Sequence, residues 1–195
     1  MKIADRARNI LLQPRQEWQV IAEEPATIRG LYREYIVPLA AIGPVALLIR
    51  LAMFGIDLHA GGRYPLPSAV GQAVLAFALN MAAVFVVALV VDVLAPTFGG
   101  RKDPIQALKV AAYVSTPGWL ASVFVLVPVL TVLALAAGLY GLYLLYLGLP
   151  VVMGAPRERA LGYTVVVVMA VVVVYLLIGL LAGAFVSLPT GPVAH

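Results

Sequence analysis

The sequence predicts an all-α integral membrane protein, a bundle of five transmembrane helices preceded by short amphipathic helices at the membrane interface. Composition is the first reason: 63% of the 195 residues are hydrophobic and only 11% are charged, which leaves too few polar side chains to cover a soluble domain. The second reason is that apolar stretches of about 20 residues, enough to cross a hydrocarbon layer about 30 Å thick, recur along the chain. The third is that Lys and Arg concentrate in alternate connections between those stretches.

Residues 1–34 form a polar segment that precedes the apolar stretches. The segment carries eleven charged side chains and lacks the apolar core of a cleavable signal peptide, so we expect the first span to direct the chain to the membrane. Ile3, Ala7 and Ile10 recur at helical spacing among basic residues, and Pro14 separates them from a second short segment. Basic amphipathic helices of this kind lie in the plane of an anionic leaflet. We therefore predict interfacial helices that contact anionic headgroups; a cap on the cytoplasmic end of the bundle and a free tail are the alternatives.

Five apolar stretches follow and form the predicted transmembrane domain, residues 35–187. Their predicted spans are 35–57, 69–95, 107–127, 129–153 and 163–187. The third and fourth stretches run together with little polar interruption, but the 49 residues from 105 to 153 are about twice the crossing length, so the chain must reverse. Pro128 is the expected turn. Residues 188–195 form a short tail.

The Lys and Arg residues outside the spans predict the topology. From the amino terminus to the tail their numbers are six, one, three, zero, two and zero, with Lys109 counted at the membrane edge of the third group. Because cytoplasmic connections carry the excess of basic residues, this alternation predicts a cytoplasmic amino terminus, an odd number of spans and a tail outside the cytoplasm. The net charge of +4 thus reflects membrane topology, and no nucleic-acid partner is expected.

Three polar side chains, Arg50, Asn80 and Asp92, are expected at or near hydrocarbon depth, where such groups usually face the protein interior or a cavity. With a rise of about 1.5 Å per residue, Arg50 and Asn80 come to similar depths, whereas Asp92 lies beyond the reach of Arg50. One interpretation is a binding or conduction site for an anion or a lipid headgroup at Arg50 and Asn80. The other is that Arg50 extends outward, towards Asp57, while Asn80 satisfies a backbone carbonyl. Asp92 is expected to be a hydrated residue at a helix end.

Small and aromatic residues indicate how the helices meet. Gly179 and Gly183 form a GxxxG pair in the last stretch, which lets two helices approach closely and offers a route to a homo-oligomer, although the pattern also arises by chance. Tyr140, Tyr143 and Tyr146 recur every three residues in the fourth stretch. Their hydroxyl groups either line a site or bond to carbonyl groups within the packed bundle.

The sequence indicates no catalytic residues, no metal site and no cofactor. Cysteine is absent, and His59 and His195, the only histidines, lie outside the spans. Asp92 alone does not supply the two carboxylates of an intramembrane aspartyl protease. The segment 98–102 lacks the spacing of a phosphate-binding loop. We therefore predict a protein that is not an enzyme.

Several short segments, each weak alone, occur in a fixed order along the chain. They are RNILLQP at 8–14, EW at 17–18, APTFGG at 95–100, YVSTP at 113–117, YGLY at 140–143, LG at 147–148 and GYT at 162–164. Together they resemble the Yip family, named for Ypt-interacting proteins, in its short bacterial form. The resemblance covers about residues 6 to 185 and implies five spans with a cytoplasmic amino terminus and an outside carboxyl terminus.

The resemblance also singles out Tyr113 and Pro117. The family's recurrent motif in the third span is Gly-Tyr-x-x-x-Pro; here Ala112 replaces the glycine, while the tyrosine and the proline match. A proline inside a membrane helix frees a backbone carbonyl and permits a kink, so we expect Pro117 to bend the third helix around its neighbours.

Eukaryotic relatives carry an Asp-Leu-Tyr-Gly-Pro motif before the first span and are implicated in binding prenylated Rab GTPases. This chain has Leu31 and Tyr32 followed by Arg33 and Glu34, so the motif is not preserved and a Rab partner is not implied. A short, cysteine-free chain suits a bacterial inner membrane.

Two functions are consistent with these observations. The first is a non-catalytic scaffold or adaptor in membrane organisation, in which the bundle is the anchor and the basic amino-terminal helices contact anionic lipid or a membrane or cytoplasmic protein partner. The alternative is a small transporter or channel for anions or small solutes that uses Arg50 and Asn80 within the bundle.

Overall fold

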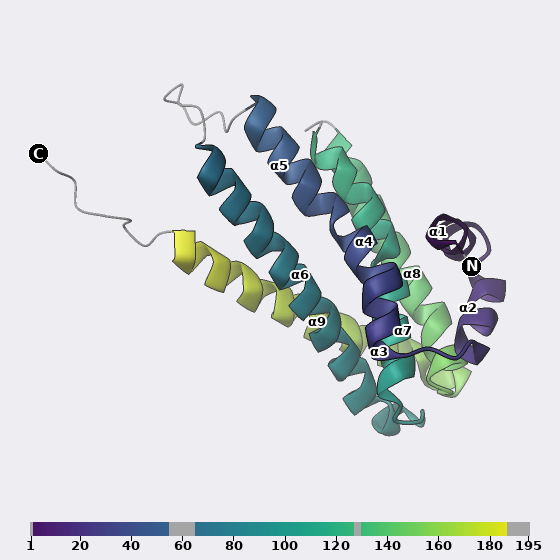
Figure 1. The fold of residues 1–195 in the computed structure, drawn as a ribbon. Coiled ribbons are helices and arrows are strands. Elements are labelled where there is room, and N and C mark those ends of the chain that lie inside the picture. The colour runs from purple at the N-terminus through teal and green to yellow at the C-terminus, as the bar shows by residue number, and fades with distance from the viewer. Residues whose placement is uncertain (1, 55–64, 127–129, 187–195) are drawn as a thin grey trace, which may run out of the picture.

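The computed structural model describes residues 2–54, 65–126 and 130–186, and every regular element in these ranges is helical (Figure 1). The predicted all-α fold class is thus confirmed for the described part of the chain. The elements are α1 (Ile3–Leu12), α2 (Pro14–Glu23), α3 (Ile28–Leu31), η1 (Tyr32–Ile36), α4 (Val37–Ala40), α5 (Ile42–Phe54), α6 (Leu66–Leu94), η2 (Pro96–Phe98), α7 (Pro104–Ala121), η3 (Ser122–Leu126), α8 (Thr131–Val152) and α9 (Arg157–Val186).

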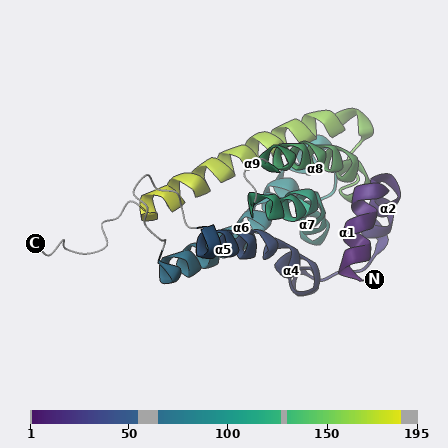
Figure 2. The same cartoon turned by 90° about the horizontal axis from the view of Figure 1, so that it is seen from above.

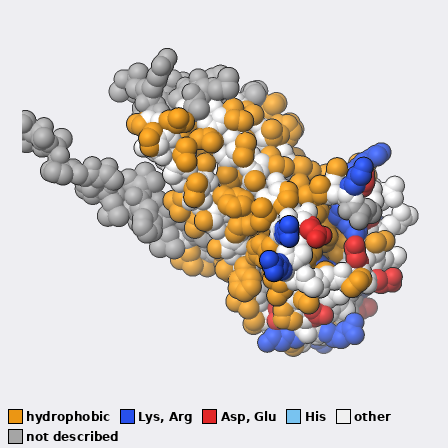
Figure 3. Space-filling model, in the orientation of Figure 1, with side chains coloured by type: hydrophobic (Ala, Val, Ile, Leu, Met, Phe, Trp, Pro, Cys, Tyr) orange, Lys and Arg blue, Asp and Glu red, His pale blue; other side chains and the backbone are white. Residues whose placement is uncertain are grey.

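Three stretches of the described residues are long and apolar enough to cross a membrane: Ile28–Leu51, Leu66–Leu94 and Val132–Val152. Large apolar side chains remain exposed along them and along α9, including Val74 and Leu135. Figure 3 shows this apolar surface over most of the bundle, with the charged side chains gathered at the end where α1 and α2 lie. Exposure of such a large apolar surface to water costs free energy, whereas lipid chains can cover it.

Helix α7 lies in the middle of the bundle. It contacts α5, α6 and α8, and at one end also α1, α3 and α4. Figures 1 and 2 show α5, α6, α7 and α8 side by side, with α9 packed on α6 and α8 near its start and diverging from α6 towards its carboxyl end. Helices α1 and α2 cross the same end of the bundle, where α1 contacts α7 and α2 contacts α8.

The first long helical stretch begins at Ile28, earlier than the apolar pattern predicts. Thr27 caps it, because the threonine side chain accepts a hydrogen bond from the Gly30 amide at 3.0 Å. The helix then widens into the π-helical turn η1 just before Pro38. In a regular helix the ring of Pro38 would clash with the carbonyl of Glu34, and the wider turn avoids that contact.

The connections α6–α7 and α8–α9 fasten the end of the bundle that carries the charges. Asp103 caps α7 by accepting from the Ile105 and Gln106 amides at 3.0 and 3.1 Å. The Arg101 amide donates to the Met153 carbonyl at 2.8 Å and so joins the two connections.

Gly100 lies where those two connections touch, and we expect Gly100→Ala to lower the free energy of unfolding by about 1–3 kcal/mol. The reason is that an added Cβ would lie 2.9 Å from the Met153 carbonyl oxygen, which is backbone and cannot move aside cheaply. Gly71→Ala is the matched control, because a Cβ there meets no heavy atom within 4 Å. Denaturation in mixed micelles measures both variants. Equal stabilities of the two would contradict the close approach at Gly100.

Candidate functional site

Asn80 and Arg50, the pair predicted to form a site, have different surroundings. The Asn80 side-chain oxygen accepts from the Trp119 indole N–H at 3.4 Å, and both residues line a mainly apolar cavity of about 440 Å³ within the bundle. Arg50 is half-buried on α5 and is not among the residues that line this cavity. No hydrogen bond joins Arg50 to Asn80 in the described part of the chain. Asp57, the other expected neighbour of Arg50, lies outside the described residues.

Asp92 is buried, with 4% of its surface exposed, so the prediction of a hydrated helix-end residue is wrong. The reason is that the start of α9 packs on α6 at this point. The Tyr163 hydroxyl donates to the Val91 carbonyl, and the Tyr163 ring stacks on Phe98 with centroids 4.9 Å apart. The sequence indicates that Asp92 lies near the membrane edge, but no local pattern in it predicts that α9 covers this residue.

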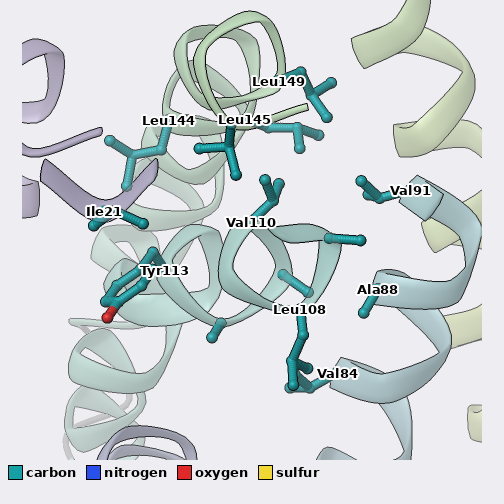
Figure 4. Packing of buried hydrophobic residues seen from close by; sticks show 14 of the residues in the cluster. Ile21, Val84, Ala88, Val91, Leu108, Val110, Tyr113, Leu144, Leu145 and Leu149 are labelled. Carbon is teal, nitrogen blue, oxygen red and sulfur yellow. The ribbon is translucent and has the colours of Figure 1, made fainter. Parts of the chain in front are cut away.

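Tyr113 of α7 contacts both the amino-terminal helices and η1. Its ring meets Trp18 of α2 edge-on at 6.2 Å and lies 4.5 Å from the ring of Tyr35 in η1. The Arg6 guanidinium of α1 lies 5.9 Å from the Tyr113 ring centroid. Figure 4 shows Tyr113 beside Ile21 of α2, at the side of α7 that faces the amino-terminal helices. The two aromatic contacts and the cation thus converge on one buried side chain.

Pro117 lies inside α7, one turn beyond Tyr113, and cannot donate to the Tyr113 carbonyl. On the same turn, the Thr116 hydroxyl forms a hydrogen bond of 2.8 Å with the Tyr35 hydroxyl. The two motif residues therefore sit where α7 meets η1.

Four charged residues form a cluster that sequence reasoning missed: Arg6, Glu17, Glu24 and Lys109. The Arg6 guanidinium donates to the Glu17 carboxylate at 2.5 Å and also pairs with Glu24. Arg6 and Glu17 are 5% and 6% exposed. A buried ion pair contributes little net stability over apolar packing, but removal of one partner leaves an uncompensated charge. The pair therefore fixes α1 against α2 in one arrangement.

Lys109 attaches the end of α2 to α7. Its ammonium group is buried and donates to the carbonyl groups of Ile21 and Glu24 at 2.7 and 2.6 Å. Gln106, one turn earlier on α7, donates to the Ala22 carbonyl at 2.9 Å. The last carbonyl groups of a helix have no partner within it and carry partial negative charge, so these two side chains of α7 cap the end of α2.

The charge cluster borders a cavity of about 380 Å³ between the α2–α3 connection, η1 and α7. Arg6, Glu24, Glu34, Lys109 and Tyr113 contribute its polar lining. Groups of both signs line the cavity, so it suits a polar or zwitterionic group of a partner. In the part of the chain that the structure describes, no three His, Asp or Glu side chains gather as metal ligands do. In the sequence, the only sign of this site is that Gln106 and Lys109 lie one helical turn apart on α7. The same spacing is equally consistent with polar residues at the edge of the membrane.

The profile of the Yip1 domain matches residues 8–181. The inner membrane protein YohC of Escherichia coli K12, and the protein of the same name from Escherichia coli O6:H1, are each 30% identical over 156 residues, which is 77% of this chain and 80% of theirs. No solved structure matches the chain.

Proposed function

This chain belongs to the Yip1 domain family, as its motifs predicted, and from that premise we propose that it is a non-catalytic adaptor of a bacterial inner membrane. The relatives named above are inner membrane proteins, which supports the location. In this proposal five helices cross the membrane, the amino terminus is cytoplasmic and the carboxyl terminus lies outside the cytoplasm.

Helices α1 and α2, here called the amino-terminal platform, are the proposed contact surface. The observation that carries the proposal is the buried charge cluster, because it holds the platform on the bundle at a defined place. Ile10, Trp18 and Ile21 of the platform are fully buried. The Tyr140 hydroxyl of α8 also donates to the Leu11 carbonyl at 2.6 Å. The platform's apolar side thus faces protein, which favours the cap on the bundle over helices that bury this side in lipid.

The outward side of the platform remains free for a partner. Arg8, Gln16 and Val20 are exposed there, and the polar cavity opens beside the end of α2. The exposed charges of the platform are of both signs, Arg8 and Arg15 beside Asp5 and Glu23. A charged surface that is held rigidly loses little conformational entropy on binding, which suits an adaptor that meets lipid headgroups or a cytoplasmic protein.

We expect a photo-crosslinking side chain at Val20 to give a discrete protein adduct in native membranes. Val165 on α9 is the matched control, because each valine is 49% exposed but Val165 lies on the apolar side of the bundle. Arg8→Glu should abolish the Val20 adduct while leaving the amount of inserted protein unchanged. Absence of an adduct at Val20, or the same adduct at Val165, would contradict the adaptor proposal.

A transporter or channel is the second candidate, and the cavity at Asn80 is the observation that favours it. A solute route built from Arg50 and Asn80 requires both to line that cavity, and Arg50 is not among its lining residues. Flux of anions and small solutes into proteoliposomes, compared for wild type, Asn80→Leu and Arg50→Leu, separates the candidates. Under the adaptor proposal none of the three supports flux.

Self-association through Gly179 and Gly183 stays a prediction. A Cβ added at Gly179 would meet no heavy atom within 4 Å, so this face of α9 has room for a second helix. Gly183 follows one turn later on α9, and only its backbone is described.

A further inference from the structure

A second polar cavity, of about 390 Å³, lies between α2, α8 and α9. Arg15 and Gln19 reach it from α2, Tyr146 from α8 and Arg157 from the first turn of α9, and Trp18 lines its wall. Neither function discussed above uses these residues together.

The cavity carries positive charge that the protein does not neutralise. No Asp or Glu is among its lining residues. In the described ranges neither Arg15 nor Arg157 has an ion-pair partner, in contrast to Arg6, which pairs with two carboxylates. Two guanidinium groups from separate helices match the oxygens of a phosphate group, which accepts paired N–H bonds from each.

Trp18 closes the inner side of the cavity. The residue is fully buried, and its indole N–H has no hydrogen-bond acceptor among the described residues. The indole is therefore closed off from the cavity, and its ring forms the inner wall against which a ligand would rest. Tyr146 and Gln19 provide further polar groups around the same space.

The sides of the cavity are apolar and face the surface that lipid covers. Val151 and Tyr146 of α8 are 39% and 42% exposed, and Leu161 of α9, next to the lining residue Ala160, is 65% exposed. A ligand with a phosphate at the two arginines therefore places its remaining part along exposed apolar side chains. This favours a lipid over a free phosphate or a phosphorylated protein.

We propose that the cavity between α2, α8 and α9 binds the phosphate headgroup of an anionic phospholipid through Arg15 and Arg157. The inference rests on the proposed function in that it names the lipid class which the platform contacts. The bound lipid would join α2 to the start of α9. The contacts between α2 and α8 connect α2 to a different helix.

Native mass spectrometry of the full chain, titrated with phosphatidylglycerol or phosphatidylcholine of the same acyl chains, tests this site. We expect the first phosphatidylglycerol to bind at least tenfold more weakly to R15Q/R157Q than to wild type. R15K/R157K should recover only part of the loss, because lysine restores the charge but not the paired N–H bonds. The matched control is R159Q, because Arg159 is exposed on the same turn of α9 but does not line the cavity. Phosphatidylcholine should bind weakly to every variant.

Three outcomes would overturn the proposal. Unchanged binding of phosphatidylglycerol to R15Q/R157Q would remove the arginines from the site, and equal binding of the two lipids would remove the charge preference. Displacement of the lipid by inorganic phosphate at millimolar concentration would assign the site to free phosphate. The adduct at Val20 is independent of these readouts, so loss of lipid binding with a retained adduct separates this inference from the adaptor proposal.

Discussion

Glu17→Ala is expected to lower the free energy of unfolding by about 3 kcal/mol, because it leaves the buried Arg6 guanidinium with Glu24 alone. The Glu24 side chain is 44% exposed and therefore compensates the charge of Arg6 only in part. Removal of one partner of a buried pair costs about 3–5 kcal/mol in soluble proteins, and the remaining carboxylate places this variant at the lower end. Denaturation of the purified protein in mixed micelles measures the loss.

Glu23→Ala is the control for that measurement. Glu23 is the neighbour of Glu24 on α2, is exposed, and has no ion-pair partner in the described ranges. We expect a change within about 0.5 kcal/mol. Equal effects of Glu17→Ala and Glu23→Ala would show that the charge cluster does not hold the platform.

Trp18→Ala is expected to cost about 3–5 kcal/mol, since it empties a fully buried site between α2, α7 and α8. The fit is close: a Cβ added at Gly148 of α8 would lie 2.7 Å from two ring carbons of Trp18. Val20→Ala on the same helix is the control, because Val20 is 49% exposed. The same denaturation assay reports both variants, with protease sensitivity of the amino terminus as a second readout.

The same two readouts distinguish an α2 that packs on the bundle from an α2 that lies in the lipid interface. If the indole of Trp18 lay in lipid instead of against Gly148, Trp18→Ala would weaken membrane attachment of α2 and leave the bundle as stable as wild type. A loss below about 1 kcal/mol would therefore contradict the packing described here.

The apolar pattern of the sequence was sufficient for the helical fold class and for the order of the long helices. It was insufficient for the platform, because the apolar side of an amphipathic helix looks the same in sequence whether lipid or protein covers it. The partners of Trp18 and Ile10 come from helices far along the chain, so no local pattern indicates them. The early start at Ile28 was missed for another reason: Arg29, Arg33 and Glu34 interrupt the apolar run, yet the helix continues through them.

The site was predicted only in part. The family motif drew attention to Tyr113, and the structure places this residue at the centre of the contacts among α1, α2 and η1. The sequence does not reveal the role of the charges beside Tyr113. Arg6 and Lys109 contribute to the cytoplasmic excess of basic residues in the same way whether their side chains are exposed or buried. The ion pair of Arg6 and Glu17 also spans the break at Pro14, so no helical spacing relates them.

Attachment of the platform to α7 is the central claim, and cross-linking of engineered cysteines tests it most directly, because the chain contains no native cysteine. Ala22→Cys with Gln106→Cys places thiols where the Gln106 side chain reaches the Ala22 carbonyl, and Val20→Cys with Gln106→Cys is the control on the outward side of α2. In native membranes a short bifunctional thiol reagent should join the first pair rapidly and the control pair hardly at all. Equal, slow cross-linking of both pairs would mean that α2 does not rest on α7, and would contradict the account.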